Sequence, residues 1–316
     1  MRVVFLGTPE IAIPPLQKLL DHACDIVAVF TQPDRPSGRG HKFKPSPVKV
    51  FAEKHGIQVF QPEKIRHQDT RKVIEDLQPD FLVVVAYGQI LPAWFLGAAI
   101  RAPLNIHFSL LPKYRGAAPI ARSILNGDSV TGVTVMIMQE ELDAGPILMQ
   151  KKIPISINAS RGELEYELSV IGAGLLIETM ERIRDGSVQP EPQDESLVSW
   201  APAISKDDAR IIWNENARKI HDHIRAMNPW PGAYTFFGDE RIRIWSSMPE
   251  SRAFFHKGQA GTFLGISDNG LRILCGEGSV LEIRELQKPS RKRINGREFA
   301  SGMHSLPKDA VFHDWK

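Results

Sequence analysis

Short apolar runs alternate with helix-like patterns through the first half of the chain. Residues 3–6 and 26–30 have the pattern of buried strands, and Ala12, Leu16 and Leu19 between them fall at the spacing of one helix face. Residues 81–86 are almost continuously apolar, which is typical of a central parallel strand covered on both faces. We expect further strands at 104–108 and 132–138 and a long helix at 163–184. This alternation predicts an α/β fold with a doubly wound parallel sheet and right-handed crossovers.

The pattern changes after Gly186. Residues 189–196 contain two prolines and show no periodicity, so we expect a linker that runs over the surface. A helical pattern at 217–224 follows, and then come short strand-like runs at 241–245, 262–266, 271–274 and 280–286. Such runs predict a small β-barrel or sandwich. The expected organisation is a first domain over residues 1–188, a linker over 189–208 and a second domain over 209–316.

Composition narrows the class of protein. The 316 residues are 42% hydrophobic, which is enough for two domains with cores of their own. The two cysteines, Cys24 and Cys275, argue against a disulfide scaffold and a multi-cysteine zinc site, and they suit a reducing cytosol. No apolar run approaches the roughly 18 residues of a membrane span, and a strand pattern begins at Arg2. We therefore expect a soluble, cytoplasmic protein with no membrane association.

The formal net charge of +2 conceals an uneven distribution. Residues 206–316 carry a net charge of +4, whereas the first 205 residues carry −2. A near-neutral total therefore does not exclude an RNA partner, because the basic residues are concentrated in the second domain.

The most informative stretch runs from Leu104 to Pro112. If it begins as a strand, Asn105, His107 and Ser109 point to one face, because side chains alternate with a period of two. Buried polar groups are costly without partners, so a satisfied polar seam or a solvent-facing edge explains the pattern as well as an active site does. The carboxyl edge of an open parallel sheet, where these residues would lie, is where such folds place their active sites.

Asp143 is a second candidate. It follows the expected strand at 132–138 and precedes Ala-Gly-Pro, so ordinary turn chemistry is the commoner explanation for an aspartate at this place. In combination with Asn105 and His107 it gains a chemical role. A carboxylate orients and charges an imidazole, and an amide donates to a developing oxyanion.

Three motifs carry a resemblance to a known family. Asn105-Ile-His-Phe-Ser-Leu-Leu-Pro112, Arg115-Gly-Ala-Ala-Pro-Ile120 and Leu142-Asp-Ala-Gly-Pro-Ile147 resemble the signature of the 10-formyltetrahydrofolate-dependent formyltransferases. The resemblance covers nearly the whole chain and is strongest to members that act on initiator tRNA. It implies a Rossmann-like catalytic domain followed by a small OB-like β-barrel domain. The reaction it implies moves a formyl group from N10 of the folate to the α-amine of methionine esterified to initiator tRNA.

The same resemblance assigns residues to roles. Asn105, His107 and Asp143 form the catalytic group, with Asn105 and His107 contacting the oxyanion and His107 handling the proton through Asp143 or an ordered water. The expected folate-binding residues are the end of the central strand, where the backbone would bind the pterin, and the segment after His107: Val85, Ala86, Tyr87, Gly88, Ser109, Leu110, Leu111 and Pro112.

Two basic segments are candidates for tRNA binding. Residues 34–47 contain glycines and prolines that argue against helix or strand, so this is either a solvated loop or, by resemblance, a loop that lies against the acceptor stem. Its expected contacts are Arg39, Lys42 and Lys44. A late cluster beside the expected barrel, Lys288, Arg291, Lys292 and Arg293, is either a solvated face or a phosphate-binding turn.

Alternatives remain open at this point. A sugar-nucleotide N-formyltransferase would share the catalytic group and the folate donor, and a noncatalytic RNA-binding module would share the fold. Gly7 follows the first strand, but the full G-x-G-x-x-G spacing is absent, which argues against NAD. No histidine or cysteine spacing indicates a metal, and no obligate protein partner is evident.

Overall fold

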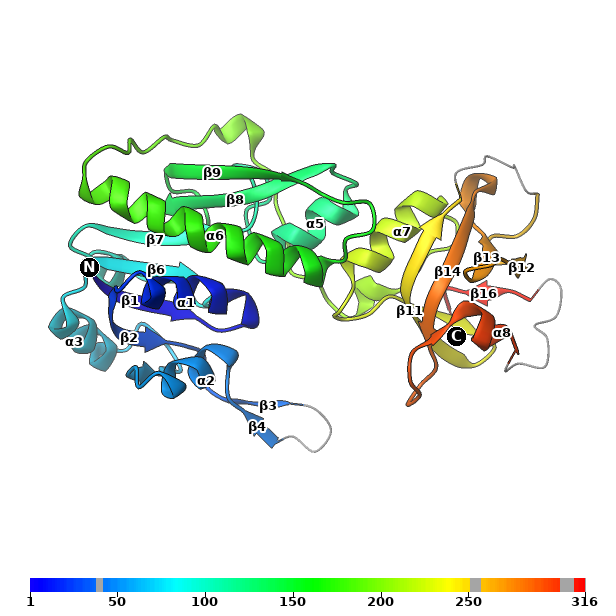
Figure 1. The fold of residues 1–316 in the computed structure, drawn as a ribbon, viewed down its shortest axis with the longest axis horizontal. Coiled ribbons are helices and arrows are strands. Elements are labelled where there is room, and N and C mark those ends of the chain that lie inside the picture. Colours follow the sequence, from blue (N-terminus) through cyan, green and yellow to red (C-terminus); the bar gives the residue numbers. More distant parts are fainter. Residues whose placement is uncertain (38–41, 251–256, 302–309, 316) are drawn as a thin grey trace. The chain divides into compact units, whose positions relative to one another are not determined.

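The computed structural model describes residues 1–37, 42–250, 257–301 and 310–315 (Figure 1). It divides into two compact units, which we treat separately. The first comprises Met1–Pro119, Val130–Ile153 and Glu165–Ala201, and the second comprises Ile120–Ser129, Pro154–Leu164 and Pro202–Lys316. Residues 189–201, expected to be part of the linker, lie in the first unit. Isolated β-bridges join Glu191 to Ile147 and Trp200 to Arg115, so this segment is attached to the unit.

A seven-stranded sheet in the order β5-β2-β1-β6-β7-β8-β9 organises the first unit. Its strands are β1 (Arg2–Gly7), β2 (Asp25–Phe30), β5 (Val59–Phe60), β6 (Phe81–Val85), β7 (Ala102–His107), β8 (Val130–Ile137) and β9 (Ile147–Pro154). The pairs from β5 to β7 are parallel, whereas β8 is antiparallel to β7. The expected α/β class is confirmed, with an antiparallel strand added beyond the parallel set.

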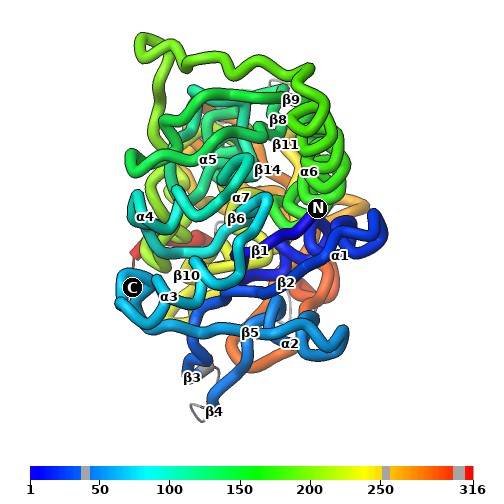
Figure 2. The backbone as a smooth tube through the Cα atoms, turned by 90° about the vertical axis from the view of Figure 1, so that its left-hand side faces the viewer, coloured from blue at the N-terminus to red at the C-terminus, as the bar shows by residue number. Residues whose placement is uncertain are grey.

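Helices cover both faces of this sheet, as Figure 2 shows, with α1 and α6 on one side and α3 and α4 on the other. The helices up to the end of the sheet region are α1 (Ile13–Asp21), α2 (Pro47–Lys54), α3 (Gln68–Leu77), α4 (Ala93–Leu96), α5 (Pro119–Leu125) and α6 (Arg161–Arg184). Ile74 of α3 and Phe95 of α4 pack against Val4, Phe30 and Leu82 of the sheet in one buried cluster. Apolar burial on both faces explains why β6 is fully buried.

The segment expected to contain neither helix nor strand forms a short ribbon, so that expectation was wrong. Strands β3 (Arg35–Ser37) and β4 (Lys42–Lys44) pair antiparallel, with Pro36 opposite Phe43. Proline donates no ladder hydrogen bond. Each strand of an isolated two-stranded ribbon has a free edge, and proline is tolerated in edge strands.

The second unit contains a curled antiparallel sheet. The strands are β10 (Tyr234–Phe237), β11 (Glu240–Pro249), β12 (Phe263–Ile266), β13 (Leu271–Leu274), β14 (Val280–Gln287), β15 (Ile294–Asn295) and β16 (Phe312–His313), with α7 (Ala217–Ala226) and α8 (Gly296–Ser301). In the order β12-β13-β14-β11-β10-β16 the ends approach each other. Phe263 N–H donates to Ala310 O at 2.7 Å, and Phe312 N–H donates to Gly261 O at 2.9 Å. This arrangement favours the barrel over the sandwich.

Candidate active site

Strand β7 places Asn105 and His107 on one face near its carboxyl end. Asn105 lies opposite Val84 of β6 and Met136 of β8, and both polar residues are buried. The Asn105 amide makes no hydrogen bond to any other residue in the described part of the chain. Because it lines a cavity, this amide is available to a bound molecule.

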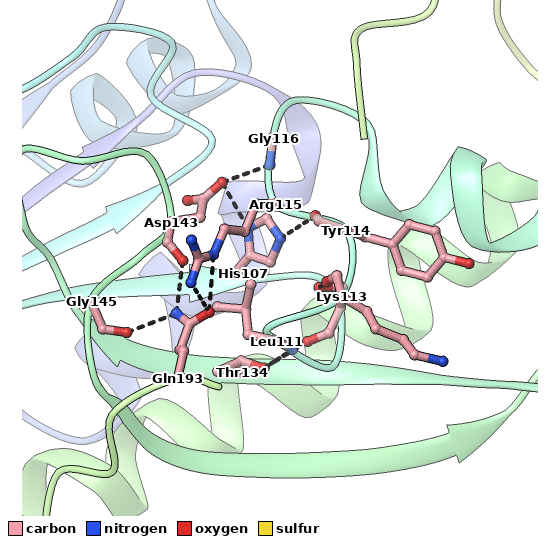
Figure 3. Close-up of polar contacts among 11 residues, drawn as sticks. His107, Leu111, Lys113, Tyr114, Arg115, Gly116, Thr134, Asp143, Gly145 and Gln193 are labelled. Atoms are coloured by element: carbon pink, nitrogen blue, oxygen red, sulfur yellow. Dashed lines mark hydrogen bonds and ion pairs between the residues drawn. The ribbon is translucent and has the colours of Figure 1, made fainter. Parts of the chain in front are cut away.

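The histidine ring has a defined tautomer. His107 Nε2 lies 2.9 Å from the carbonyl oxygen of Tyr114, and a carbonyl only accepts, so Nε2 carries the proton and donates it (Figure 3). Nδ1 then faces Asp143 Oδ2 at 3.6 Å, which is longer than a hydrogen bond. The expectation that neutral His107 also donates to the oxyanion does not fit this geometry, because its one N–H is already used. Nδ1 is instead placed to accept a proton.

Asp143 lies on a tightly constrained turn. Its φ of 52° is in the left-handed region, which aspartate tolerates better than most residues. Its Oδ2 accepts the Gly116 N–H at 2.8 Å. A Cβ at Gly145 would collide with the carbonyl oxygen of Ile137, so the close approach of this turn to the end of β8 requires glycine.

A separate hydrogen-bond network builds the turn after β7. Ser109 Oγ donates to Lys113 O at 2.6 Å, and Thr134 Oγ1 donates to Ser109 O at 2.6 Å. Gln150 Nε2 donates to Leu111 O at 2.8 Å. These bonds fix the turn that presents the Tyr114 carbonyl to His107. Residues 109–112, expected at the folate, line no part of the cavity beside His107.

The cavity has a volume of about 450 Å³, within the range of small-molecule sites. Asn105, His107 and Asp143 form part of its wall, and Ile90, Leu91, Met138 and Leu142 are among its apolar lining residues. A fused ring system with a polar edge fits such a lining.

The end of β6 provides the polar backbone at this cavity. Ala86, Tyr87 and Gly88 line it, whereas Val85 does not. Ala86 has a φ of 48° and Gly88 a φ of 90°, so the chain turns sharply here and exposes peptide groups. The Tyr87 side chain is 2% exposed, and burial raises the pKa of its hydroxyl.

The basic residues of the first unit are only partly described. Arg39 lies outside the described residues, and Lys42 is placed by its backbone in β4. Lys44 lies opposite Arg35, and both line a second cavity, of about 410 Å³, beside the ends of β1 and β6.

The late basic cluster lies at the end of β14 and on the following turn. Lys288 pairs with Glu240 at 3.4 Å and lies over the ring of Phe299. The Arg293 guanidinium lies 3.8 Å from the centre of the Trp245 ring. These two cations have partners within the protein. Arg291 and Lys292 are exposed on the turn.

Sequence reasoning missed several residues that support the site. Thr134 and Gln150 hold the turn after β7, and Gln193 donates to the Asp143 carbonyl at 2.8 Å. The Arg-Gly pair at 115–116 was visible only as part of a motif. Gln193 lies in the proline-containing stretch expected to be a linker, where no periodicity signals a buried contact.

The described residues show neither a metal site nor a membrane-spanning helix. No group of histidine, cysteine, aspartate or glutamate side chains there could hold a metal ion. Among those same residues, no helix is both long and apolar enough to cross a membrane.

Comparisons with known proteins give consistent family matches. A family model described as formyl transferase matches residues 1–180, and one described as formyl transferase, C-terminal domain, matches residues 203–304. The methionyl-tRNA formyltransferase of Citrifermentans bemidjiense is 42% identical over 97% of this chain and 95% of its own length. That of Trichlorobacter lovleyi is 44% identical over 95% of this chain and 94% of its own length.

A solved structure shares the fold. WlaRD, described as a sugar 3N-formyl transferase in the presence of dTDP and 5-N-formyl-THF, superposes with a TM-score of 0.68 at 20% identity. The match covers 92% of this chain and 99% of that chain. At 20% identity this similarity shows a shared fold and does not identify the substrate that accepts the formyl group.

Proposed function

This chain belongs to the formyl transferase family, and on that premise we propose that it transfers the formyl group of 10-formyltetrahydrofolate to the α-amino group of methionyl initiator tRNA, for translation initiation. Relatives named for that reaction are 42–44% identical over at least 95% of the chain, whereas WlaRD is only 20% identical. The observation that carries the chemistry is the free Asn105 amide beside His107 Nδ1 and Asp143 in one cavity. Such a reaction takes place in the cytoplasm, with the tRNA.

Asn105, His107 and Asp143 have different roles in the proposed reaction. The folate donor supplies an activated formyl group on N10, and the methionyl amine attacks its carbon. The Asn105 N–H groups donate to the formyl oxygen as negative charge develops there. His107 Nδ1 accepts the proton that the attacking amine loses, and Asp143 Oδ2 stabilises the resulting imidazolium. The C–N10 bond then breaks, and the same proton passes to N10.

The hydrogen bond to the Tyr114 carbonyl determines which ring nitrogen of His107 accepts the proton. It holds the Nε2–H, so the lone pair of neutral His107 points toward the cavity and Asp143. The 450 Å³ cavity would hold the folate, and the backbone of Ala86–Gly88 would bind its pterin. Val85 and residues 109–112 lie outside the cavity lining.

The tRNA contacts come from both units. Arg35, Lys42 and Lys44 belong to the basic ribbon of the catalytic unit. Arg39, which lies outside the described residues, is a further contact that the family resemblance implies. In the second unit, Lys288, Arg291, Lys292 and Arg293 offer positive charge to phosphates. Arg291 and Lys292 are the members best placed for this, because their side chains are exposed, whereas Lys288 pairs with Glu240 and the exposed Arg293 lies against the Trp245 ring.

One assay tests which substrate accepts the formyl group. The protein is incubated with 10-formyltetrahydrofolate and either methionyl initiator tRNA or a dTDP-linked amino sugar, and formylated product is quantified. Formylation of the tRNA at a much higher kcat/KM supports the proposal. Preferential formylation of the amino sugar would replace it with a sugar-nucleotide N-formyltransferase, and the absence of both products would remove the enzymatic assignment.

A further inference from the structure

Gln193 reaches the catalytic turn from a distant part of the chain. Its Nε2 donates to the carbonyl oxygens of Asp143 and Gly145, each at 2.8 Å. Both bonds go to the backbone of the turn that carries the Asp143 carboxylate. Fifty positions separate Gln193 from Asp143, so the contact holds two segments together that local sequence does not connect.

A buried arginine fixes the orientation of this amide. Nε and Nη2 of Arg115 donate to Gln193 Oε1 at 3.1 and 2.9 Å, and the Arg115 residue is 1% exposed (Figure 3). Arginine only donates and carbonyls only accept, so Oε1 must face Arg115 and Nε2 must face the turn. The Gln193 amide is therefore satisfied in one orientation only.

The turn needs such support. Asp143 has a φ of 52°, a conformation that persists only where the surroundings determine it. Its carboxylate is held by the Gly116 N–H, and Gly116 follows Arg115 directly. One short segment thus holds the carboxylate of Asp143 directly and its backbone through Gln193.

We propose that Gln193 is a positioning residue for formyl transfer, anchored by Arg115, which holds the Asp143 turn so that the carboxylate faces His107 Nδ1. The proposal rests on the proposed function, because Asp143 stabilises the charged imidazole in that reaction. Gln193 itself lines no part of the cavity and contacts no reacting atom.

Two isosteric exchanges separate this role from general stability. Gln193→Glu keeps an acceptor for Arg115 but sets oxygens against the Asp143 and Gly145 carbonyls. Gln193→Met removes the donors to the turn and the acceptor for Arg115 without adding charge. Glu195→Gln is the matched control. Glu195 is the other partner of Arg115, with its side chain 70% exposed, and it makes no hydrogen bond to the turn.

The measurement is kcat and KM for both substrates, with thermal unfolding recorded for each variant. We expect both Gln193 variants to lose roughly 10²-fold in kcat, because misplacing a catalytic group by about 1 Å has that effect, while both KM values stay within about threefold. Glu195→Gln should stay within about threefold of the wild type in kcat. Wild-type kcat in folded Gln193→Glu and Gln193→Met would overturn the proposal.

A double-mutant cycle identifies the route of the effect. If Gln193 acts through Asp143, adding Gln193→Met to Asp143→Ala should lower kcat by less than about twofold, because the positioned group is already gone. A further loss as large as that of Gln193→Met alone would show that Gln193 acts elsewhere and would refute the positioning role. Wild-type formylation of methionyl tRNA in the same assay shows whether the proposed function itself holds.

Discussion

The Asn105 amide makes the sharpest test of the chemistry, because the folded protein does not use it. Asn105 is 8% exposed and has no hydrogen-bond partner in the described part of the chain. Asn105→Ala therefore breaks no internal hydrogen bond, and we expect the free energy of unfolding to change by less than about 1 kcal/mol. Loss of one oxyanion donor costs about 2.7–4 kcal/mol in the transition state, or a 10²–10³-fold fall in kcat.

A second asparagine provides the opposite expectation. Asn216 caps α7, where its Oδ1 accepts the Lys219 N–H at 3.0 Å. Asn216→Ala should therefore destabilise the protein by about 1 kcal/mol and leave kcat unchanged. The two alanine variants exchange the same residue type, so their comparison separates a catalytic amide from a structural one.

The assay is formylation of methionyl initiator tRNA under single-turnover conditions with both substrates saturating, alongside urea unfolding of the same preparations. Single-turnover rates exclude product release, which would otherwise hide a slower chemical step. A single-turnover rate constant for Asn105→Ala within about tenfold of the wild-type value would refute the oxyanion role. Earlier unfolding of Asn105→Ala than of Asn216→Ala would refute the structural premise.

Three further predictions concern other features. Gly116→Ala should lower both the thermal stability and kcat, because Gly116 has a φ of 122° and an added Cβ would lie 2.8 Å from Ala201 O. A thermal melting curve and a kcat measurement test this expectation. Burial lowers the pKa of His221 from 6.5, so the unfolded chain binds a proton that the folded protein excludes, and stability should fall as the pH drops below 6.5, by up to about 1.4 kcal/mol per pH unit. His221→Gln should flatten that dependence in urea titrations. Neutralising Arg291 and Lys292 together should reduce the slope of log K against log salt for tRNA by about 1–2, measured by filter binding.

Periodicity predicted five of the seven strands of the sheet, β1, β2, β6, β7 and β8, but neither β5 nor β9. The apolar runs at 3–6, 26–30 and 81–86 correspond to β1, β2 and β6, because strands buried on both faces contain little else. The ribbon of β3 and β4 was not predictable in this way. It buries no apolar face, so no alternation distinguishes it from a loop, and its proline misled the assignment.

The residues of the candidate site likewise include some that the sequence pattern predicted and others that it could not. Asn105 and His107 share a strand face, so a period of two was enough to associate them. Asp143 and Gln193 could not be joined by spacing, because their contact depends on a left-handed turn and on a buried arginine far away in the sequence. Family resemblance identified Asp143 but gave no reason to select Gln193 from its proline-containing segment.

The site is therefore held by two supports, which meet at the Tyr114–Arg115 peptide. Thr134 and Gln150 fix the turn that presents the Tyr114 carbonyl, which sets the tautomer of His107. Arg115 and Gln193 fix the turn that aims Asp143 at the same ring. Because the first support determines where the proton is accepted and the second determines how the resulting charge is stabilised, damage to either lowers the rate by a different route. Because the two supports share that peptide and act on the same His107–Asp143 pair, a variant in one should change the effect on kcat of a variant in the other, which a double-mutant cycle measures.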